Sequence, residues 1–113
     1  MELYNELENL IKQLKASVKE LQKTGKAYAE AERDYKILLR KECLKLRDEG
    51  TAIGMIDKIC YGIPSVADAR FKRDMAQVVY EANQEGINSV KVQIRVIEGQ
   101  LKREYSLSGE GDL

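Results

Sequence analysis

The chain has 113 residues, enough for one small domain, and its 19 Lys and Arg residues balance 19 Asp and Glu residues. It has no His, which excludes His-dependent zinc sites, Ser-His triads and the usual near-neutral general base. No stretch approaches the roughly 18 apolar residues of a membrane span, and nothing indicates a secretory signal. Without that context, Cys43 and Cys60 are interpreted as reduced thiols and small buried side chains. We therefore expect a cytoplasmic protein with no membrane partner.

A leucine stripe predicts a long first helix that starts near residue 2. Its spacing is close to a heptad repeat, with apolar positions at Leu3, Leu7, Leu10, Leu14 and Leu21. Gly25 interrupts this pattern, but the apolar phase continues through Tyr28 and Tyr35. The preserved phase favours one continuous helix, and the alternative is two helices with a reversing turn. Gly50 follows an acidic pair and suits the left-handed position after a helix end, so we expect the helix to stop there.

A short helix and a second long helix are predicted after this stop. Thr51 is expected to cap the short helix, and Gly62-Ile63-Pro64 is expected to end it. Ser65-Val66-Ala67-Asp68 has the S-x-x-D form related to a capping box, which predicts the start of the last helix. Apolar residues then recur at helical spacing without a proline, including Met75, Val78, Val79, Val90, Ile94, Ile97 and Leu101. We expect the Gly/Ser-rich tail of residues 106–113 to be disordered.

These elements predict an all-α fold. The simplest arrangement is an antiparallel hairpin of two long helices with a short helix in the connecting corner, as one domain of residues 1–105. Leu10 and Leu14 would then meet Ile94 and Ile97 in a buried seam. Because a helical hairpin buries less surface than a globule does, a homodimer or other coiled-coil oligomer is also expected.

The sequence offers no catalytic, cofactor-binding or metal-binding residues. Two carboxylate pairs occur at i,i+4 spacing, Glu30 with Asp34 and Glu81 with Glu85. A helical di-iron site needs Glu-x-x-His motifs, and the chain has no His. It also lacks a Gly-rich phosphate loop and a nucleophile elbow. We therefore expect a protein that is not an enzyme and needs no cofactor.

Basic residues gather near the predicted corner. Residues 33–47 contain six basic and two acidic residues, and a second basic cluster follows at residues 70–73. Such clusters bind phosphates in nucleic-acid-binding proteins, although they also occur on solvated faces. Arg and aromatic side chains beside exposed apolar ones are typical of interaction hot spots, whereas a tight connector would turn its apolar residues inward. The candidate partner-binding residues are Arg40, Arg47, Tyr61, Ile63, Arg70 and Arg73.

Several stretches resemble small helical proteins encoded by temperate phages and prophages of Gram-positive bacteria. They are YAEAERDYKI at 28–37, LRDEG at 46–50, ICYG at 59–62, VADARFKRD at 66–74 and IRVIEGQLKRE at 94–104. The resemblance covers about residues 25–105, carries no catalytic motif and implies an accessory protein of the bacterial host cytoplasm.

The expected function is a non-catalytic protein–protein interaction module that binds and inhibits a host protein, such as a component of a defence system. One alternative is a nucleic-acid-binding accessory factor in phage replication, recombination or packaging. Another is a structural coiled-coil component of a virion or packaging complex.

Overall fold

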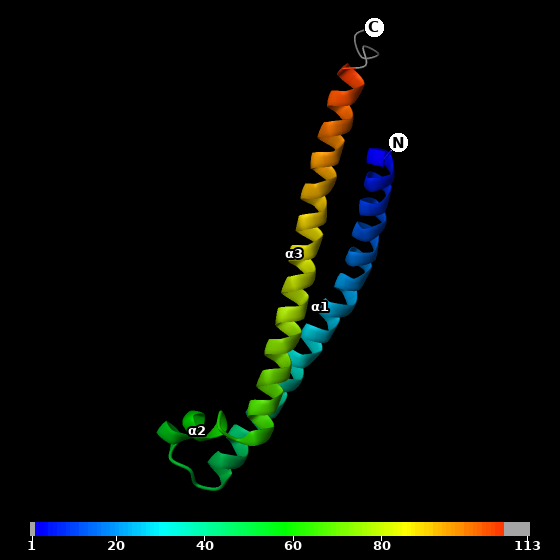
Figure 1. Cartoon of the computed structure of the whole chain (residues 1–113). Helices are drawn as coiled ribbons and strands as arrows, with labels where there is room; N and C mark the ends of the chain where they lie inside the picture. The colour runs from blue at the N-terminus through cyan, green and yellow to red at the C-terminus, as the bar shows by residue number, and fades with distance from the viewer. Residues whose placement is uncertain (1, 108–113) are drawn as a thin grey trace. The chain divides into compact units, whose positions relative to one another are not determined.

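The structure is a computed structural model that describes residues 2–107, and it is all-α, as the sequence predicts. Its helices are α1 (Glu2–Asp48), α2 (Ile53–Cys60) and α3 (Pro64–Leu107). The two long helices pack against each other, and α2 lies between them in the chain (Figure 1). Residues 2–107 contain no strand. None of the helices within this range combines the length and the apolar composition that a membrane crossing requires.

Helix α1 continues through Gly25 without a break, which confirms the prediction of a single helix. The absence of a side chain at Gly25 matters for the packing of α1 on α3. A Cβ atom at Gly25 would lie 3.1 Å from Cε1 of Tyr80 on α3. The Tyr80 ring also packs against the Tyr28 ring, with 5.9 Å between the ring centroids. Gly25 therefore leaves room for an aromatic pair between α1 and α3.

The end of α1 is set by Gly50, as the sequence predicts. Gly50 has φ of +87°, a backbone conformation that favours glycine. The Gly50 N–H donates to the Arg47 carbonyl at 3.1 Å, and the Thr51 N–H donates to the Leu46 carbonyl at 3.1 Å. This pair of hydrogen bonds is the Schellman motif, which satisfies carbonyls left without partners at the helix end.

The two predicted N-caps are wrong. The N-cap of α2 is Ala52 rather than Thr51, and it makes no side-chain capping bond. Helix α3 begins at Pro64, so Ser65 lies inside the helix rather than before it. Proline suits the first helical position because its φ is preset and its missing N–H would have had no partner there. The Ala67 N–H donates to the Ile63 carbonyl at 2.9 Å, which closes the first turn.

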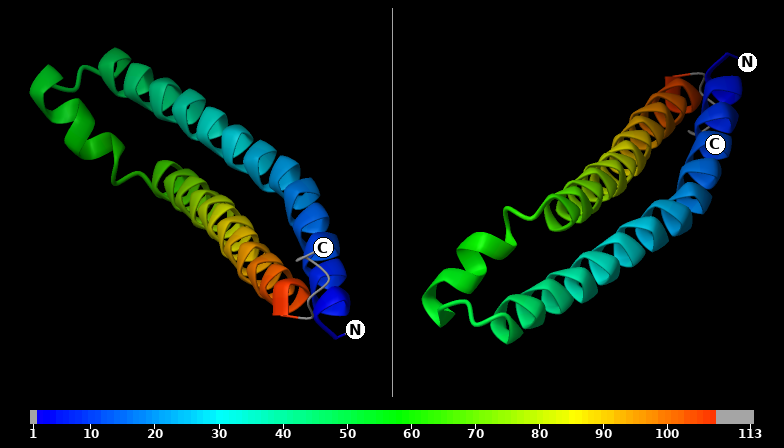
Figure 2. Two further views of the ribbon diagram at one scale, coloured as in Figure 1. Left: turned by 90° about the horizontal axis from the view of Figure 1, so that it is seen from above. Right: turned by 90° about the horizontal axis from the view of Figure 1, so that it is seen from below.

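Two short connections join α2 to its neighbours (Figure 2). After Cys60, the Tyr61, Gly62 and Ile63 N–H groups donate to the carbonyls of Asp57, Ile59 and Cys60, respectively. The backbone therefore keeps its hydrogen bonds as the chain turns from α2 into α3. These backbone hydrogen bonds fix the positions of Tyr61, Gly62 and Ile63 between the two helices.

Within residues 2–107 the contacts group the chain into two compact units. One unit consists of residues 23–81, and the other combines residues 2–22 with residues 82–107. The core of the first unit is formed by Tyr35, Cys60 and Val66. In the second unit Ile87 and Val90 are buried, and the Asn83 side chain donates to the Ser17 carbonyl at 3.2 Å.

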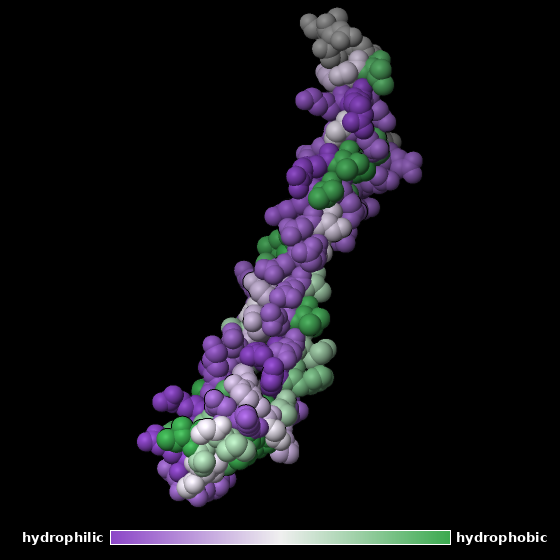
Figure 3. Space-filling model, turned by 90° about the vertical axis from the view of Figure 1, so that its left-hand side faces the viewer, coloured by the Kyte–Doolittle hydropathy of each residue, from purple (hydrophilic) through white to green (hydrophobic). Residues whose placement is uncertain are grey.

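The predicted seam residues are less buried than expected. Leu10, Leu14, Ile94 and Ile97 are all half-buried. A residue between only two helices is covered on one side, whereas a core residue of a larger bundle is covered by several neighbours. Figure 3 shows apolar side chains in green at intervals over the face seen, separated by hydrophilic ones in purple.

Helix α3 ends at Leu107, two residues beyond the predicted boundary. Ser106 and Leu107 are therefore helical, although the sequence analysis placed them in a disordered tail. The rest of that tail, residues 108–113, lies outside the described residues.

Candidate interaction surface at the helical corner

A small core holds α2 against the ends of both long helices within the unit of residues 23–81. Cys60 at the end of α2 and Val66 at the start of α3 are fully buried beside Tyr35 of α1. The partly buried side chains packed around these three are Leu38, Leu39, Cys43, Leu46, Ile63 and Ala69. This core holds α2 through its last turn, and the side chains of Ile53, Met55 and Ile59 remain exposed.

Helix α2 exposes apolar side chains that the sequence analysis did not select as a site. Ile53 is 88% exposed, and Met55 and Ile59 are also exposed. The signal was present, because five of the eight residues of α2 are apolar and lie within an arc of about 160° round the helix. The core covers this apolar face at Cys60 and leaves Ile53, Met55 and Ile59 exposed.

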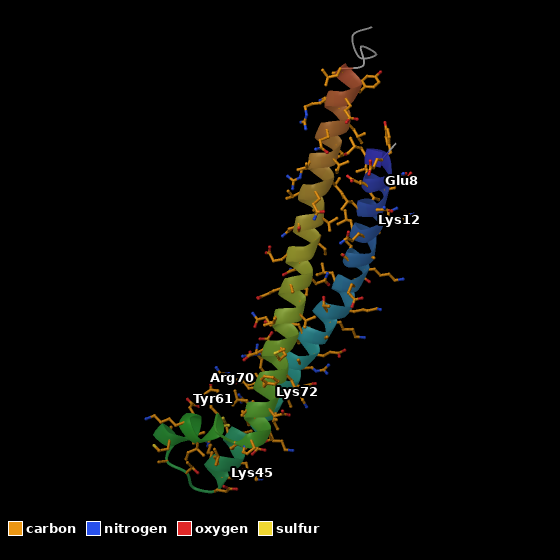
Figure 4. The ribbon with its side chains drawn as sticks, viewed as in Figure 1. Glu8, Lys12, Lys45, Tyr61, Arg70 and Lys72 are labelled. Atoms are coloured by element: carbon orange, nitrogen blue, oxygen red, sulfur yellow. The ribbon has the colours of Figure 1, made fainter. Side chains whose placement is uncertain are left out.

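Tyr61 and Arg70 form a pair next to these apolar residues. Tyr61 is exposed, as predicted, and the Arg70 guanidinium carbon lies 5.8 Å from the centre of its ring. Figure 4 shows the two residues beside each other where α2 gives way to α3. Such a cation–π contact orients both side chains while they remain accessible. We call Ile53, Met55, Ile59, Tyr61 and Arg70 the corner surface.

Two of the candidate residues face inward instead. Ile63 is half-buried and packs on the core of Tyr35, Cys60 and Val66. The Arg73 guanidinium carbon lies 4.6 Å from the centre of the Tyr35 ring. Its Nη2 donates to Asp74 at 2.8 Å, and this hydrogen bond raises the pKa of Arg73 above its ordinary value. Ile63 and Arg73 therefore support the fold rather than contribute to the corner surface.

Arg40 and Arg47 are exposed on α1 but are not part of the corner surface. Together with Arg33 they recur every seven residues, so the three share one face of α1. That face lies roughly 140° round the helix from Tyr35, which contacts the core. The structure thus brings Tyr61 and Arg70 together and leaves Arg40 and Arg47 on a separate basic face.

Much of the basic charge near the corner is paired with neighbouring carboxylates. Arg33 binds Asp34 at 3.0 Å, Lys36 binds Glu32 at 3.6 Å, and Lys72 binds Asp68 at 3.2 Å. Affinity for nucleic acid comes from basic groups that neutralise phosphates and release counterions. Adjacent acidic groups reduce that release, so these ion pairs weaken the case for a nucleic-acid site.

The two free cysteines meet between α1 and α2. The Cys43 thiol donates to Cys60 Sγ at 3.3 Å, and the Cys60 thiol donates to the Leu39 carbonyl at 3.6 Å. Burial, followed by the hydrogen bond from Cys43, raises the pKa of Cys60 from 9.0 to about 11. Cys60 is therefore a neutral, buried side chain at physiological pH, and Cys43 is half-buried.

We expect iodoacetamide to modify Cys43 in the folded protein and Cys60 only after unfolding. The thiolate is the reactive form, and Cys60 is both inaccessible and protonated below about pH 11. Mass spectrometry of labelled peptides with and without denaturant measures this difference. Cys43→Ser is the control and should leave the folded protein unlabelled. Equal labelling of both thiols under native conditions would contradict the packing of α2 on α1.

Within residues 2–107, no group of three or more cysteine or carboxylate side chains is placed to hold a metal ion. No protein-family model matches the chain, and no curated protein or solved structure is significantly similar to it.

Proposed function

We propose that this chain is a non-catalytic helical interaction module that binds another protein through the corner surface. The observation that carries the proposal is the exposed apolar group on α2 beside the Tyr61–Arg70 pair. Interface hot spots combine aromatic and Arg side chains with apolar neighbours that lose water on binding. The core under α2 presents this group in a fixed arrangement, which lowers the entropic cost of association.

An antiparallel hairpin of α1 and α3 is part of this proposal. Its support is the order of the contacts within the unit of residues 23–81. Tyr28 packs on Tyr80, and seven residues further along α1 Tyr35 packs on Arg73, which lies seven residues earlier on α3. In such a hairpin both long helices would lead into the corner, where the short helix is displayed.

The biological setting in the proposal comes from the resemblance to small proteins of temperate phages and prophages. On that basis the module acts in the bacterial cytoplasm as a phage accessory protein, and its partner is a host protein whose activity it inhibits. The corner surface suits a partner patch that is apolar at its centre and carries a carboxylate for Arg70.

The test is a comparison of two double variants in pull-downs from host lysate. Tyr61→Ala with Arg70→Ala should lose a bound protein that the unmodified chain retains. Tyr4→Ala with Lys12→Ala is the matched control, because it also removes one exposed Tyr and one exposed basic residue. Circular dichroism verifies that both variants remain folded. Unchanged binding by the corner variant, or capture of nucleic acid alone in a gel-shift assay, would contradict the proposal.

A further inference from the structure

The two cysteines of the chain are distant in the sequence but in contact in the fold, within the unit of residues 23–81. Cys43 lies on α1, and Cys60, 17 positions later, is the last residue of α2. The chain turns at Gly50 between them, and the eight residues of α2 then bring Cys60 back to α1. The two sulfur atoms are 3.3 Å apart. Because a disulfide bond is about 2 Å long, only a small approach of these atoms separates the pair from bonding distance.

The two thiols differ in their access to solvent. Cys60 is 0% exposed, whereas Cys43 is half-buried, so a reagent that enters from solvent meets the Cys43 sulfur first. The Cys60 thiol donates to the Leu39 carbonyl, which holds the Cys60 sulfur beside Cys43. In redox-sensitive pairs an accessible cysteine is oxidised first, and a neighbouring cysteine then resolves it to a disulfide. Cys43 and Cys60 have the positions that these two roles require.

The charges around the pair favour an uncharged oxidant. Burial raises the pKa of Cys60 most, and the negative charges of Glu42 and Asp57 also raise it. Both carboxylates therefore act at the position of the pair. Their charge repels anionic oxidants such as glutathione disulfide. Hydrogen peroxide is small and uncharged, so it reaches the half-buried Cys43 sulfur without this repulsion.

We propose that Cys43 and Cys60 form a reversible disulfide when hydrogen peroxide oxidises the protein. In the first step the Cys43 sulfur bonds to one peroxide oxygen and the O–O bond breaks. Cys43 becomes a sulfenic acid, and its thiol proton leaves with the other oxygen as water. In the second step the Cys60 sulfur bonds to the Cys43 sulfur and the S–O bond breaks. Hydroxide leaves and takes the Cys60 proton, which gives a second water. The two thiols together lose two electrons, and one peroxide is reduced to two waters.

The disulfide connects α2 covalently to α1. In the reduced protein α2 is held by the core of Tyr35, Cys60 and Val66, and it opens whenever Cys60 leaves that core. The disulfide closes the 17-residue segment between the two cysteines into a ring, which restricts this opening. A dithiol reductant reverses the link by thiol–disulfide exchange and restores the reduced pair.

The same link would act on the corner surface, because Ile59 and Tyr61 are the immediate neighbours of Cys60 in the chain. Oxidation would fix the end of α2 that presents these two side chains. This consequence for binding rests on the proposed function, whereas formation of the disulfide does not.

The experiment treats the folded protein with hydrogen peroxide, blocks the remaining thiols with iodoacetamide in denaturant, and maps tryptic peptides without reductant. Trypsin cuts after Lys and Arg, so Cys43 falls on the peptide of residues 42–45 and Cys60 on that of residues 59–70. The two peptides should be joined in monomeric protein, and dithiothreitol should separate them. Amide hydrogen exchange of residues 53–60 should slow by more than about tenfold in the oxidised protein.

Two variants separate the roles of the two thiols, and circular dichroism verifies that each is folded. Cys60→Ala removes the resolving thiol, so Cys43 should stop at the sulfenic acid, which dimedone traps. Cys43→Ser removes the accessible thiol, so Cys60 should remain unoxidised at the same peroxide concentration.

Three outcomes with the unmodified chain would overturn the proposal. These are sulfinic acid on Cys43 in place of the joined peptides, a Cys43–Cys43 link between two chains, and exchange in α2 that oxidation does not slow. None of these measurements uses a binding partner. A failure of the disulfide is therefore distinguishable from a failure of the proposed function, which the pull-down tests.

Discussion

Replacing Tyr35 with alanine is expected to lower the free energy of unfolding by about 3–5 kcal/mol, the range for removing a buried aromatic ring. Tyr35 is 5% exposed and lies in the core with Cys60 and Val66. Its ring also carries the Arg73 guanidinium, whose carbon lies 4.6 Å from the ring centre. The substitution therefore leaves a cavity and exposes a charge that had been held against an aromatic face. Denaturant titration followed by circular dichroism measures the loss.

Tyr4→Ala is the matched control for this variant. Tyr4 also lies on α1 but is 50% exposed, so its removal should change the free energy of unfolding by less than about 1 kcal/mol. Tyr35→Phe keeps the ring and should retain most of the stability. A Tyr35→Ala loss no larger than that of Tyr4→Ala would contradict the core that positions α2.

The helix limits were accessible from the sequence because local chemistry determines them. Gly50 ends α1 since glycine readily takes the positive φ that the Schellman motif requires. The continuity of α1 through Gly25 followed from the apolar phase, which one glycine does not shift. The caps of α2 and α3 were missed because Thr51 and Ser65 suit a cap by residue type, whereas the preset φ of Pro64 determines where α3 begins.

The burial pattern of α3 was harder to predict because the helix has two apolar faces. The apolar spacing predicts that Met75, Val78 and Val79 belong with the packing residues, but all three are exposed. Arg73, a charged residue, occupies a packing position and lies over the Tyr35 ring. A search for regularly spaced apolar residues therefore misses the contact between α3 and α1 at Arg73. Which face of α3 is covered depends on where α1 packs, and the sequence of α3 alone does not specify this.

The candidate site was predicted in part. The exposure of Tyr61 followed from its place on a connection, and its contact with Arg70 required the path of the chain between α2 and α3. The inward orientation of Ile63 depends on the core formed by three separate helices, which no local pattern encodes. For the same reason the exposed Ile53 was overlooked, because the sequence does not show how little of α2 its neighbours cover.

In the second unit, Ile87→Ala is expected to lower the free energy of unfolding by about 2–5 kcal/mol. Ile87 is 6% exposed and lies at a packing position of α3, next to the buried Val90 along the same face. Removing three carbon atoms there leaves space that two packed helices close only in part, so the lost contacts are not replaced. Thermal or denaturant unfolding of the variant measures the effect.

Ile37→Ala separates the packing effect of Ile87→Ala from that of the substitution itself. Ile37 is 62% exposed in the interior of α1, so both changes replace isoleucine by alanine within a long helix. Alanine is the better helix former, and at the exposed site this gain offsets the small loss of contacts. The control should therefore stay within about 0.5 kcal/mol of the unmodified chain. If Ile87→Ala were as mild as Ile37→Ala, residues 82–107 would not be held by the packing described, and their contact with residues 2–22 would contribute little to stability.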